Sequence, residues 1–132
     1  MNPAAIFHSF PGGAGMVTPY SPAVEIDGWV FLAGQVPNDP PNEATPLPPD
    51  IEGQTRLAMD NLLAALRPLG LDLSDLVAVR IFLTRFEEEF ARMNATYRSF
   101  FPSDRLPART CVGVTALVGG GRIEIDGIAR RR

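Results

Sequence analysis

A proline-rich segment at residues 36–50 is the feature that most restricts how this chain can fold. Proline fixes its own backbone angle and has no amide hydrogen to donate, so it is excluded from the interior of a helix or a central strand. We therefore predict an exposed loop over 36–50. This loop is too short to separate domains, and 132 residues are the usual length of one domain, so residues 1–132 are expected to form a single domain.

The apolar residues before this loop are arranged as in β-strands, and those after it as in an α-helix. Before it, residues 23–26 and 29–33 are short apolar runs separated by Asp27-Gly28, a dipeptide that favours a hairpin turn. After it, Asp50 can cap a helix that ends at Pro68 and Gly70. The apolar positions of this helix are Ile51, Ala58, Met59, Leu62, Leu63 and Leu66. A β-hairpin is therefore predicted to precede a helix with one buried face.

In the second half of the chain, a strand pattern is again followed by a helix pattern. Residues 77–84 alternate apolar and mixed positions and predict a strand. A second helix is predicted from about Glu87, and its aromatic stripe is expected to belong to the core. The stripe consists of Phe86, Phe90, Met93, Tyr97, Phe100 and Phe101. Two final strands, 108–117 and 122–129, flank a glycine-rich turn, which gives the order β-β-α-β-α-β-β and an α+β fold with both helices on one face of a mixed sheet.

The composition excludes several kinds of chemistry. All 12 cationic residues are arginines, and without lysine the chain cannot form a Schiff base, attach pyridoxal or build a phosphate-loop lysine site. Any Ser-His-Asp or Cys-His arrangement would depend on the single histidine, His8. One histidine and one cysteine cannot make the usual zinc site, although an oxygen-only Mg²⁺ site stays open.

Charge and hydropathy bound the possible partners. A net charge of −3 gives no overall attraction to nucleic acid, and the locally basic run Arg130-Arg131-Arg132 is interpreted as a solvated terminus. The first residues lack the apolar stretch of a signal peptide, and no apolar run is long enough to span a membrane. With one unpaired cysteine, a cytoplasmic protein is expected.

Charged residues interrupt the two final strands. Alternation puts Arg109 and Cys111 on the same side of their strand, and a guanidinium is well shaped to bind a carboxylate. Glu124 lies between two isoleucines and is expected to share a face with Arg122 and Asp126. From the pattern alone, Glu124 and Arg109 could each belong to an ordinary cross-strand ion pair.

The register of these strands decides whether the two charges can meet. If the strands form a simple hairpin, Leu117 pairs near Arg122 and Arg109 lies opposite Arg130. Arg109 and Glu124 are then roughly 20 Å apart at the usual rise per residue. A site that uses both residues would have to take them from different subunits.

Several runs of this sequence together resemble the RidA/YjgF family, also called reactive-intermediate deaminases. The resemblance covers nearly the whole chain and rests on Thr18-Pro19-Tyr20-Ser21, Val30-Phe31-Leu32-Ala33-Gly34-Gln35-Val36-Pro37, Gln54-Thr55-Arg56, Val79-Arg80-Ile81-Phe82-Leu83-Thr84, Met93-Asn94-Ala95-Thr96-Tyr97, Pro107-Ala108-Arg109-Thr110-Cys111-Val112 and Ile123-Glu124-Ile125. It implies a homotrimer of chorismate-mutase-like α+β subunits with clefts between the subunits.

The resemblance also implies roles for individual residues. Arg109 should bind the substrate carboxylate, and Glu124 should position a water molecule. The residues that match other substrate-contacting positions of the cleft are Tyr20, Ala33, Gly34, Asn94 and Cys111. The chain departs from the family at Ala33, where serine is frequent, and at Pro22, where glutamine is common. A hydroxyl contact is thereby lost, and the loop after Tyr20 is expected to differ.

The reaction implied by the resemblance is the hydrolysis of a 2-imino acid, formed from an enamine such as 2-aminoacrylate, to a 2-oxo acid and ammonia. Imines already hydrolyse in water, so orientation and a bound water suffice, with no metal or organic cofactor. Cys111 is given a packing or contact role, because no lysine or nearby histidine would lower its pKa. Two other functions stay open: a module that binds small carboxylates without turnover and, less favoured, a ribonuclease or translation inhibitor, which usually needs histidine or lysine and a basic groove.

Overall fold

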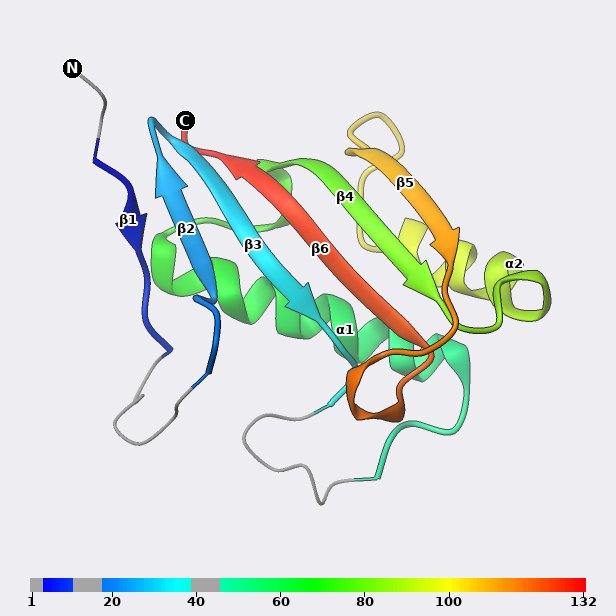
Figure 1. The fold of residues 1–132 in the computed structure, drawn as a ribbon. Helices are drawn as coiled ribbons and strands as arrows, with labels where there is room; N and C mark the ends of the chain where they lie inside the picture. Colours follow the sequence, from blue (N-terminus) through cyan, green and yellow to red (C-terminus); the bar gives the residue numbers. More distant parts are fainter. Residues whose placement is uncertain (1–3, 11–17, 39–45) are drawn as a thin grey trace.

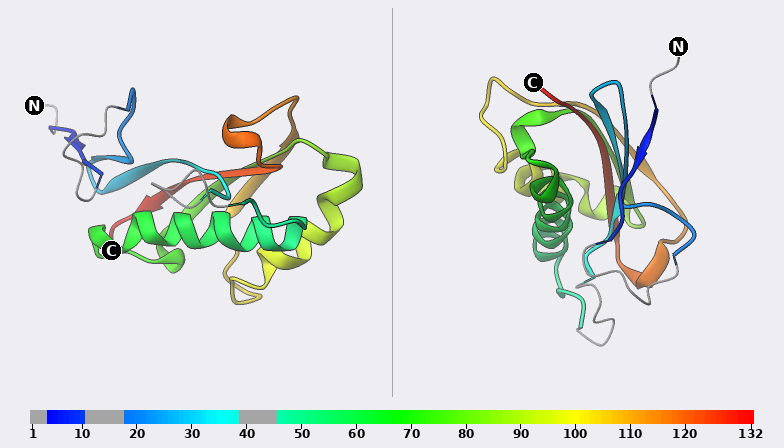
Figure 2. Two further views of the ribbon diagram at one scale, coloured as in Figure 1. Left: turned by 90° about the horizontal axis from the view of Figure 1, so that it is seen from below. Right: turned by 90° about the vertical axis from the view of Figure 1, so that its left-hand side faces the viewer.

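The computed structural model describes residues 4–10, 18–38 and 46–132, which form two layers. A six-stranded sheet is one layer, and two helices cover one of its faces (Figures 1 and 2). The elements are β1 (Ile6–Phe7), β2 (Ala23–Ile26), β3 (Trp29–Gln35), α1 (Ile51–Leu66), β4 (Leu76–Leu83), α2 (Phe86–Arg98), β5 (Ala108–Gly113) and β6 (Ile123–Arg130). The predicted α+β class, with a mixed sheet and both helices on one face, is confirmed.

The strand order differs from the prediction at the C-terminal end. β6 lies between β3 and β4 and is antiparallel to both, while β5 pairs in parallel with the other side of β4. The predicted hairpin of the last two strands is therefore wrong. The chain passes around the end of β4, where the Val114 amide donates to the Leu83 carbonyl at 2.9 Å and the Thr84 amide donates to the Arg122 carbonyl at 3.1 Å. The segment between β5 and β6 is long enough to make this crossing.

Several strand limits also shift. β5 ends at Gly113 instead of residue 117, because Gly113 pairs with Leu83, the last residue of β4. β1 was not predicted, since two residues carry too little pattern to be recognised. In β4, a register shift between Leu76 and Ala78 places Leu76 in the core and leaves Val77 41% exposed, although Val77 was expected on the core face.

Both helices begin and pack as their sequences predict. The Asp50 carboxylate accepts a hydrogen bond from the Gly53 amide at 2.8 Å and caps α1. After α1 a 3₁₀ turn ends at Gly70, whose φ of 75° is the left-handed conformation that glycine allows. The aromatic stripe of α2 belongs to the core, as expected. Its members Met93, Tyr97 and Phe101 are buried, and Phe86, Phe90 and Phe100 pack against them.

The predicted loop contains neither helix nor strand at residues 36–38 and 46–50, while residues 39–45 lie outside the described part. It is not wholly exposed, because Pro37 is buried. Helix α1 holds both ends of it. The Asn61 side-chain amide donates to the Val36 carbonyl at 3.0 Å, and the Gln54 amide donates to the Pro48 carbonyl at 2.9 Å.

The arginines at residues 130–132 are only in part a solvated terminus, because Arg130 and Arg132 are exposed but Arg131 is partly buried and ion pairs hold Arg131 and Arg132. Arg131 binds the buried carboxylate of Glu25 and donates to the Leu69 carbonyl at 2.8 Å. Arg132 binds the buried Asp75 at 2.9 Å. These contacts attach the end of the chain after β6 to strand β2 and to the turns that follow α1.

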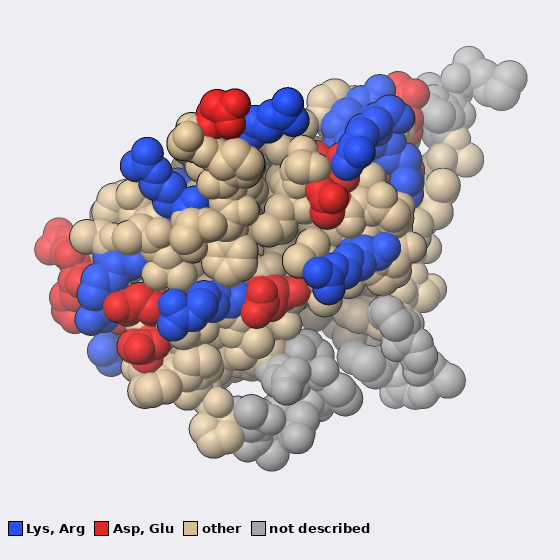
Figure 3. Space-filling view, turned by 180° about the vertical axis from the view of Figure 1, so that it is seen from behind, with Lys and Arg blue, Asp and Glu red and all other residues tan. Residues whose placement is uncertain are grey.

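The helix-covered face carries basic and acidic side chains in alternation, without a large area of one sign (Figure 3). The described residues include no helix that is both long and apolar enough to span a membrane.

Candidate functional site

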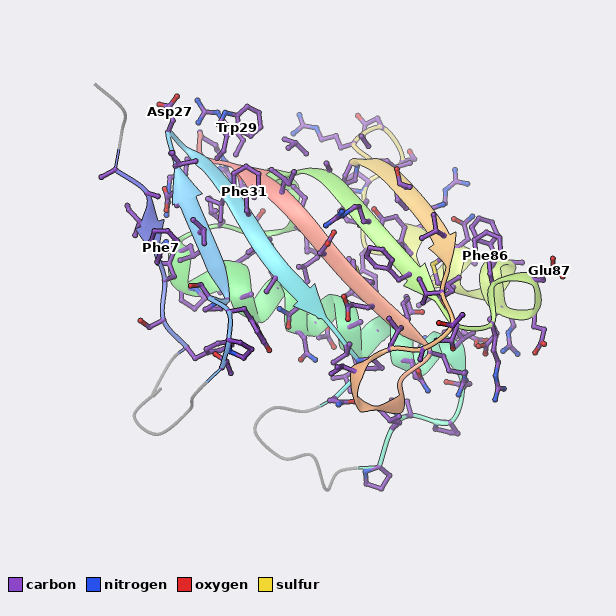
Figure 4. All side chains as sticks on the ribbon, in the orientation of Figure 1. Phe7, Asp27, Trp29, Phe31, Phe86 and Glu87 are labelled. Atoms are coloured by element: carbon purple, nitrogen blue, oxygen red, sulfur yellow. The ribbon has the colours of Figure 1, made fainter. Side chains whose placement is uncertain are left out.

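The face of the sheet opposite the helices is open and exposes several large apolar side chains. The large side chains exposed on it include Trp29 and Phe31, which Figure 4 labels, and Val112; each is more than 40% exposed. Their orientation follows from strand alternation, because Val30 and Leu32 point to the helices and are buried. An exposed apolar surface of this kind is typical of a face that another protein chain covers.

Glu124 projects from β6 onto this open face. Its neighbours Ile123 and Ile125 are fully buried in the core, which forces the intervening side chain to the other side of the sheet. Asp126 shares its face, as predicted, and binds Arg80 on β4 at 2.6 Å.

The prediction that Arg122 also shares this face is wrong. Arg122 precedes β6, so strand alternation does not govern it, and its guanidinium lies on the helix side. There it donates to Glu89 of α2 at 2.8 Å and to the Pro49 carbonyl at 3.1 Å.

Glu124 itself has no hydrogen bond or ion pair to any described residue. Burial raises the pKa of this carboxyl above its usual 4.5, and the negative charge of Asp126 adds to the effect. Gly34 of β3 lies directly against it: a Cβ built at Gly34 would come within 2.8 Å of the Glu124 carboxyl carbon. Glycine at position 34 therefore leaves room for the carboxylate, and Ala33 precedes it on the same strand.

Arg109 lies on β5 and points to the other face, toward α2. Its guanidinium carbon is 5.0 Å from the ring centre of Tyr97 and 5.9 Å from that of Phe90. Cys111 points the same way, as predicted, and packs against the core. Burial raises the pKa of the Cys111 thiol, with Arg109 acting in the opposite direction. Asn94 is one helical turn from both rings and partly buried, which places it in the same region.

The lack of an anionic partner distinguishes Arg109 from the arginines with similar burial. All 12 arginines lie in the described part of the chain, and three of them are partly buried. Arg122 binds Glu89 and Arg131 binds Glu25, but no ion pair or side-chain hydrogen bond joins Arg109 to a described residue, and its guanidinium lies beside two aromatic rings. A partly buried guanidinium with free N–H groups is a receptor for a carboxylate.

Arg109 and Glu124 do not meet within one copy of the chain. Arg109 lies opposite Val79 and Glu124 opposite Phe82, with β4 between their strands. This register separates their Cα atoms by roughly 14 Å, and the two side chains point to opposite faces of the sheet. The two residues are apart, as the sequence predicts, but by less than the roughly 20 Å of the hairpin register. The intervening β4 separates them, and not a hairpin.

Tyr20 lies near the opposite edge of the sheet from Arg109, just before β2. It is 57% exposed and packs edge-on against Phe10, with ring centres 5.8 Å apart. Together with His8 and Pro22, these rings line a hollow of about 410 Å³. Sequence reasoning did not find Phe10 or His8 as neighbours of Tyr20, because their proximity depends on the unpredicted strand β1.

The predicted site residues therefore lie in three places on one chain, with Tyr20 apart from the others. Glu124 and Gly34 are in contact on the open face, while Arg109, Asn94 and Cys111 gather between β5 and α2. Within the described residues, no three histidine, cysteine, aspartate or glutamate side chains are close enough together to hold a metal ion.

Comparisons with known proteins find a matching family model, similar sequences and similar solved structures. A family model described as endoribonuclease L-PSP matches residues 14–131. The chain is 42% identical to protein DfrA of Myxococcus xanthus, with 86% of each chain covered. It is 35% identical to the 2-iminobutanoate/2-iminopropanoate deaminase of Escherichia coli K12, covering 88% of this chain and 90% of that one. Among solved structures, Escherichia coli TdcF with bound serine is similar, with a TM-score of 0.78, 32% identity and coverage of 89% and 92%.

The environment of Glu124 predicts a measurable titration. Its pKa should lie above 4.5, so the carboxyl keeps its proton to a higher pH than an ordinary glutamate. In Asp126→Asn the pKa should fall only partly toward 4.5, because burial is the larger cause. Carboxyl-carbon NMR titration measures the pKa of Glu124 in the wild-type protein and in Asp126→Asn. Substitution of the exposed Asp60 in Asp60→Asn is the control and should leave the pKa of Glu124 at its wild-type value. An unshifted Glu124 in the wild-type protein would contradict this description.

Proposed function

Because this chain belongs to the RidA/YjgF family, we propose that it is a hydrolytic deaminase of small 2-imino acids, such as those formed from 2-aminoacrylate. The observation that carries the proposal is Arg109, a partly buried guanidinium without an anionic partner among the described residues. A 2-imino acid supplies the missing carboxylate. The name of the similar Escherichia coli deaminase and the serine in the similar TdcF structure point to the same class of small carboxylate.

Each charged residue has one task in the proposed reaction. Arg109 binds the substrate carboxylate through two parallel hydrogen bonds. Glu124 accepts a proton from a water molecule as the water oxygen adds to the imine carbon, and passes it to nitrogen to give a carbinolamine. It then transfers the hydroxyl proton to the same nitrogen as the carbon–nitrogen bond breaks and the carbon–oxygen double bond forms. The products are a 2-oxo acid and ammonia. Burial and the nearby Asp126 raise the pKa of the Glu124 carboxyl, so its carboxylate is a stronger base toward the water molecule than an ordinary glutamate.

The active site in this proposal is completed by neighbouring copies in a homotrimer. Arg109 of one copy approaches the Glu124 group of the next, because the two groups lie on opposite faces of one chain. The same association would cover the exposed Trp29, Phe31 and Val112 of the open face.

No metal or organic cofactor has a step in this reaction. Cys111 is proposed to contact the ligand without attacking it, because burial raises its pKa and the thiol stays protonated near neutral pH. Ala33 supplies no hydroxyl, so the substrate contacts at that position come from the backbone.

Two other functions have less support. A module that binds small carboxylates without turnover would use the same Arg109, and turnover assays separate it from the enzyme. The family description names an endoribonuclease, but the net charge is −3 and the single histidine, His8, lies 3.3 Å from the carboxylate of Glu25. This arrangement offers RNA neither a basic groove nor a free acid–base histidine.

In solution the protein should have three times the 14.3 kDa mass of one chain. The reason is that the open apolar face and the divided site both require neighbouring copies. Light scattering at micromolar concentration measures this mass. A stable monomer with full activity would contradict the proposed site.

Turnover should depend on Arg109 and Glu124 in different ways. With 2-aminoacrylate generated from serine by a dehydratase, Arg109→Ala should lower kcat/KM by roughly 10²-fold or more, because the carboxylate loses its charged hydrogen bonds. Arg109→Lys should recover little, since an ammonium cannot reproduce the planar fork. Glu124→Gln should bind pyruvate normally and turn over about 10² to 10⁴ times more slowly.

The controls for this assay are Arg98→Ala, an exposed arginine of α2, and Cys111→Ser. The first should behave as wild type, and the second should keep a substantial part of the activity. Wild-type protein that binds pyruvate but accelerates nothing would leave the binding module as the function. Normal activity in Arg109→Ala would remove the central residue from both functions.

A further inference from the structure

Two rings of the aromatic stripe of α2 lie both against the core and beside Arg109. Tyr97 is 3% exposed and fixed against Phe101, with ring centres 5.1 Å apart. Phe90 is held by Phe86, with ring centres 5.0 Å apart in a stacked arrangement. Both Tyr97 and Phe90 present an aromatic ring within cation–π distance of Arg109, at 5.0 and 5.9 Å.

A ring holds a guanidinium differently from a carboxylate. A carboxylate occupies the N–H groups and neutralises the charge, as Glu89 does for Arg122 and Glu25 does for Arg131. A ring attracts the cation through its π face and takes no N–H hydrogen bond, so the donors stay available for a ligand. Arg109 is thus fixed in place without losing its capacity to bind an anion.

We propose that Tyr97, assisted by Phe90, is the positioning residue of Arg109: its ring holds the guanidinium so that the hydrogen-bonding fork is ready for the ligand carboxylate. This inference rests on the proposed role of Arg109. Tyr97 acts through Arg109 and need not touch the substrate. The closer ring distance assigns the larger share to Tyr97 and the smaller to Phe90.

The hydroxyl of Tyr97 provides a matched control. It is buried and has no hydrogen-bond partner among the described residues, so its removal leaves no other group unpaired. Tyr97→Phe keeps the ring and loses only this hydroxyl. Tyr97→Leu removes the ring and keeps an apolar side chain.

The test compares the binding of pyruvate with that of its neutral amide, pyruvamide, by calorimetry. Tyr97→Leu should weaken pyruvate binding by about 5- to 30-fold and Phe90→Leu by less, because the cation–π contact is lost. Neither substitution should change pyruvamide binding, and Tyr97→Phe should bind both as wild type does. In turnover assays, Tyr97→Leu should raise KM with little change in kcat.

A double-mutant cycle and an NMR signal separate positioning from general destabilisation. In an Arg109→Ala background, Tyr97→Leu should cause no further loss of pyruvate affinity. The Arg109 Nε–H resonance should show a ring-current shift in wild type and Tyr97→Phe, which Phe90→Leu reduces and Tyr97→Leu reduces further. Phe90→Leu supplies the same tests if Tyr97→Leu does not fold.

The outcomes distinguish this inference from the proposed function. If wild type fails to bind pyruvate, the proposed function fails, while the NMR signal still reports whether the rings hold Arg109. Pyruvate binding that requires Arg109 but is unaffected by Tyr97→Leu or Phe90→Leu would overturn the positioning role. The proposed function would then stand. An equal loss in Tyr97→Phe and Tyr97→Leu would also overturn the positioning role, because the hydroxyl and not the ring would then be responsible.

Discussion

The central position of β6 is the constraint on which the rest of the structure depends. Its isoleucines at 123 and 125 are fully buried under the helices, and both of its edges are paired, to β3 and to β4. With those two side chains fixed in the core, Glu124 can only point to the open face. The same strand brings Glu124 against Gly34 and ties the end of the chain to the core through Arg131. The acidic half of the site is therefore a consequence of packing.

The two unpaired charges are best understood together. Glu124 is partly desolvated beside a like charge, and Arg109 is partly buried over aromatic rings, each without an opposite charge among the described residues. Burial of an uncompensated charge is unfavourable, so groups of this kind concentrate at functional sites. Within one chain, β4 keeps them apart and on opposite faces. In the proposed homotrimer, a second copy would bring the complementary groups together and cover the exposed apolar face.

The sequence predicted the properties that depend on a strand's own pattern. It placed Glu124 opposite its isoleucines, Arg109 beside Cys111, and the aromatic stripe of α2 in the core. It failed where the answer depends on which strand pairs with which: alternation in β5 and β6 is the same whether they form a hairpin or flank β4. Arg122 was misplaced because it precedes the strand whose period was applied to it. The ring contacts of Arg109 were missed because no pattern within β5 indicates that α2 lies above it.

The central claim is that one site takes Arg109 and Glu124 from different copies of the chain. It can be tested by unfolding Arg109→Ala and Glu124→Gln together in equal amounts, refolding the mixture, and measuring deaminase turnover against each variant refolded alone. After random assembly, about one quarter of the clefts contain both a wild-type Arg109 and a wild-type Glu124. The mixture should therefore recover roughly a quarter of wild-type activity. A mixture as inactive as its two components, although shown by mass spectrometry to contain mixed oligomers, would contradict the account.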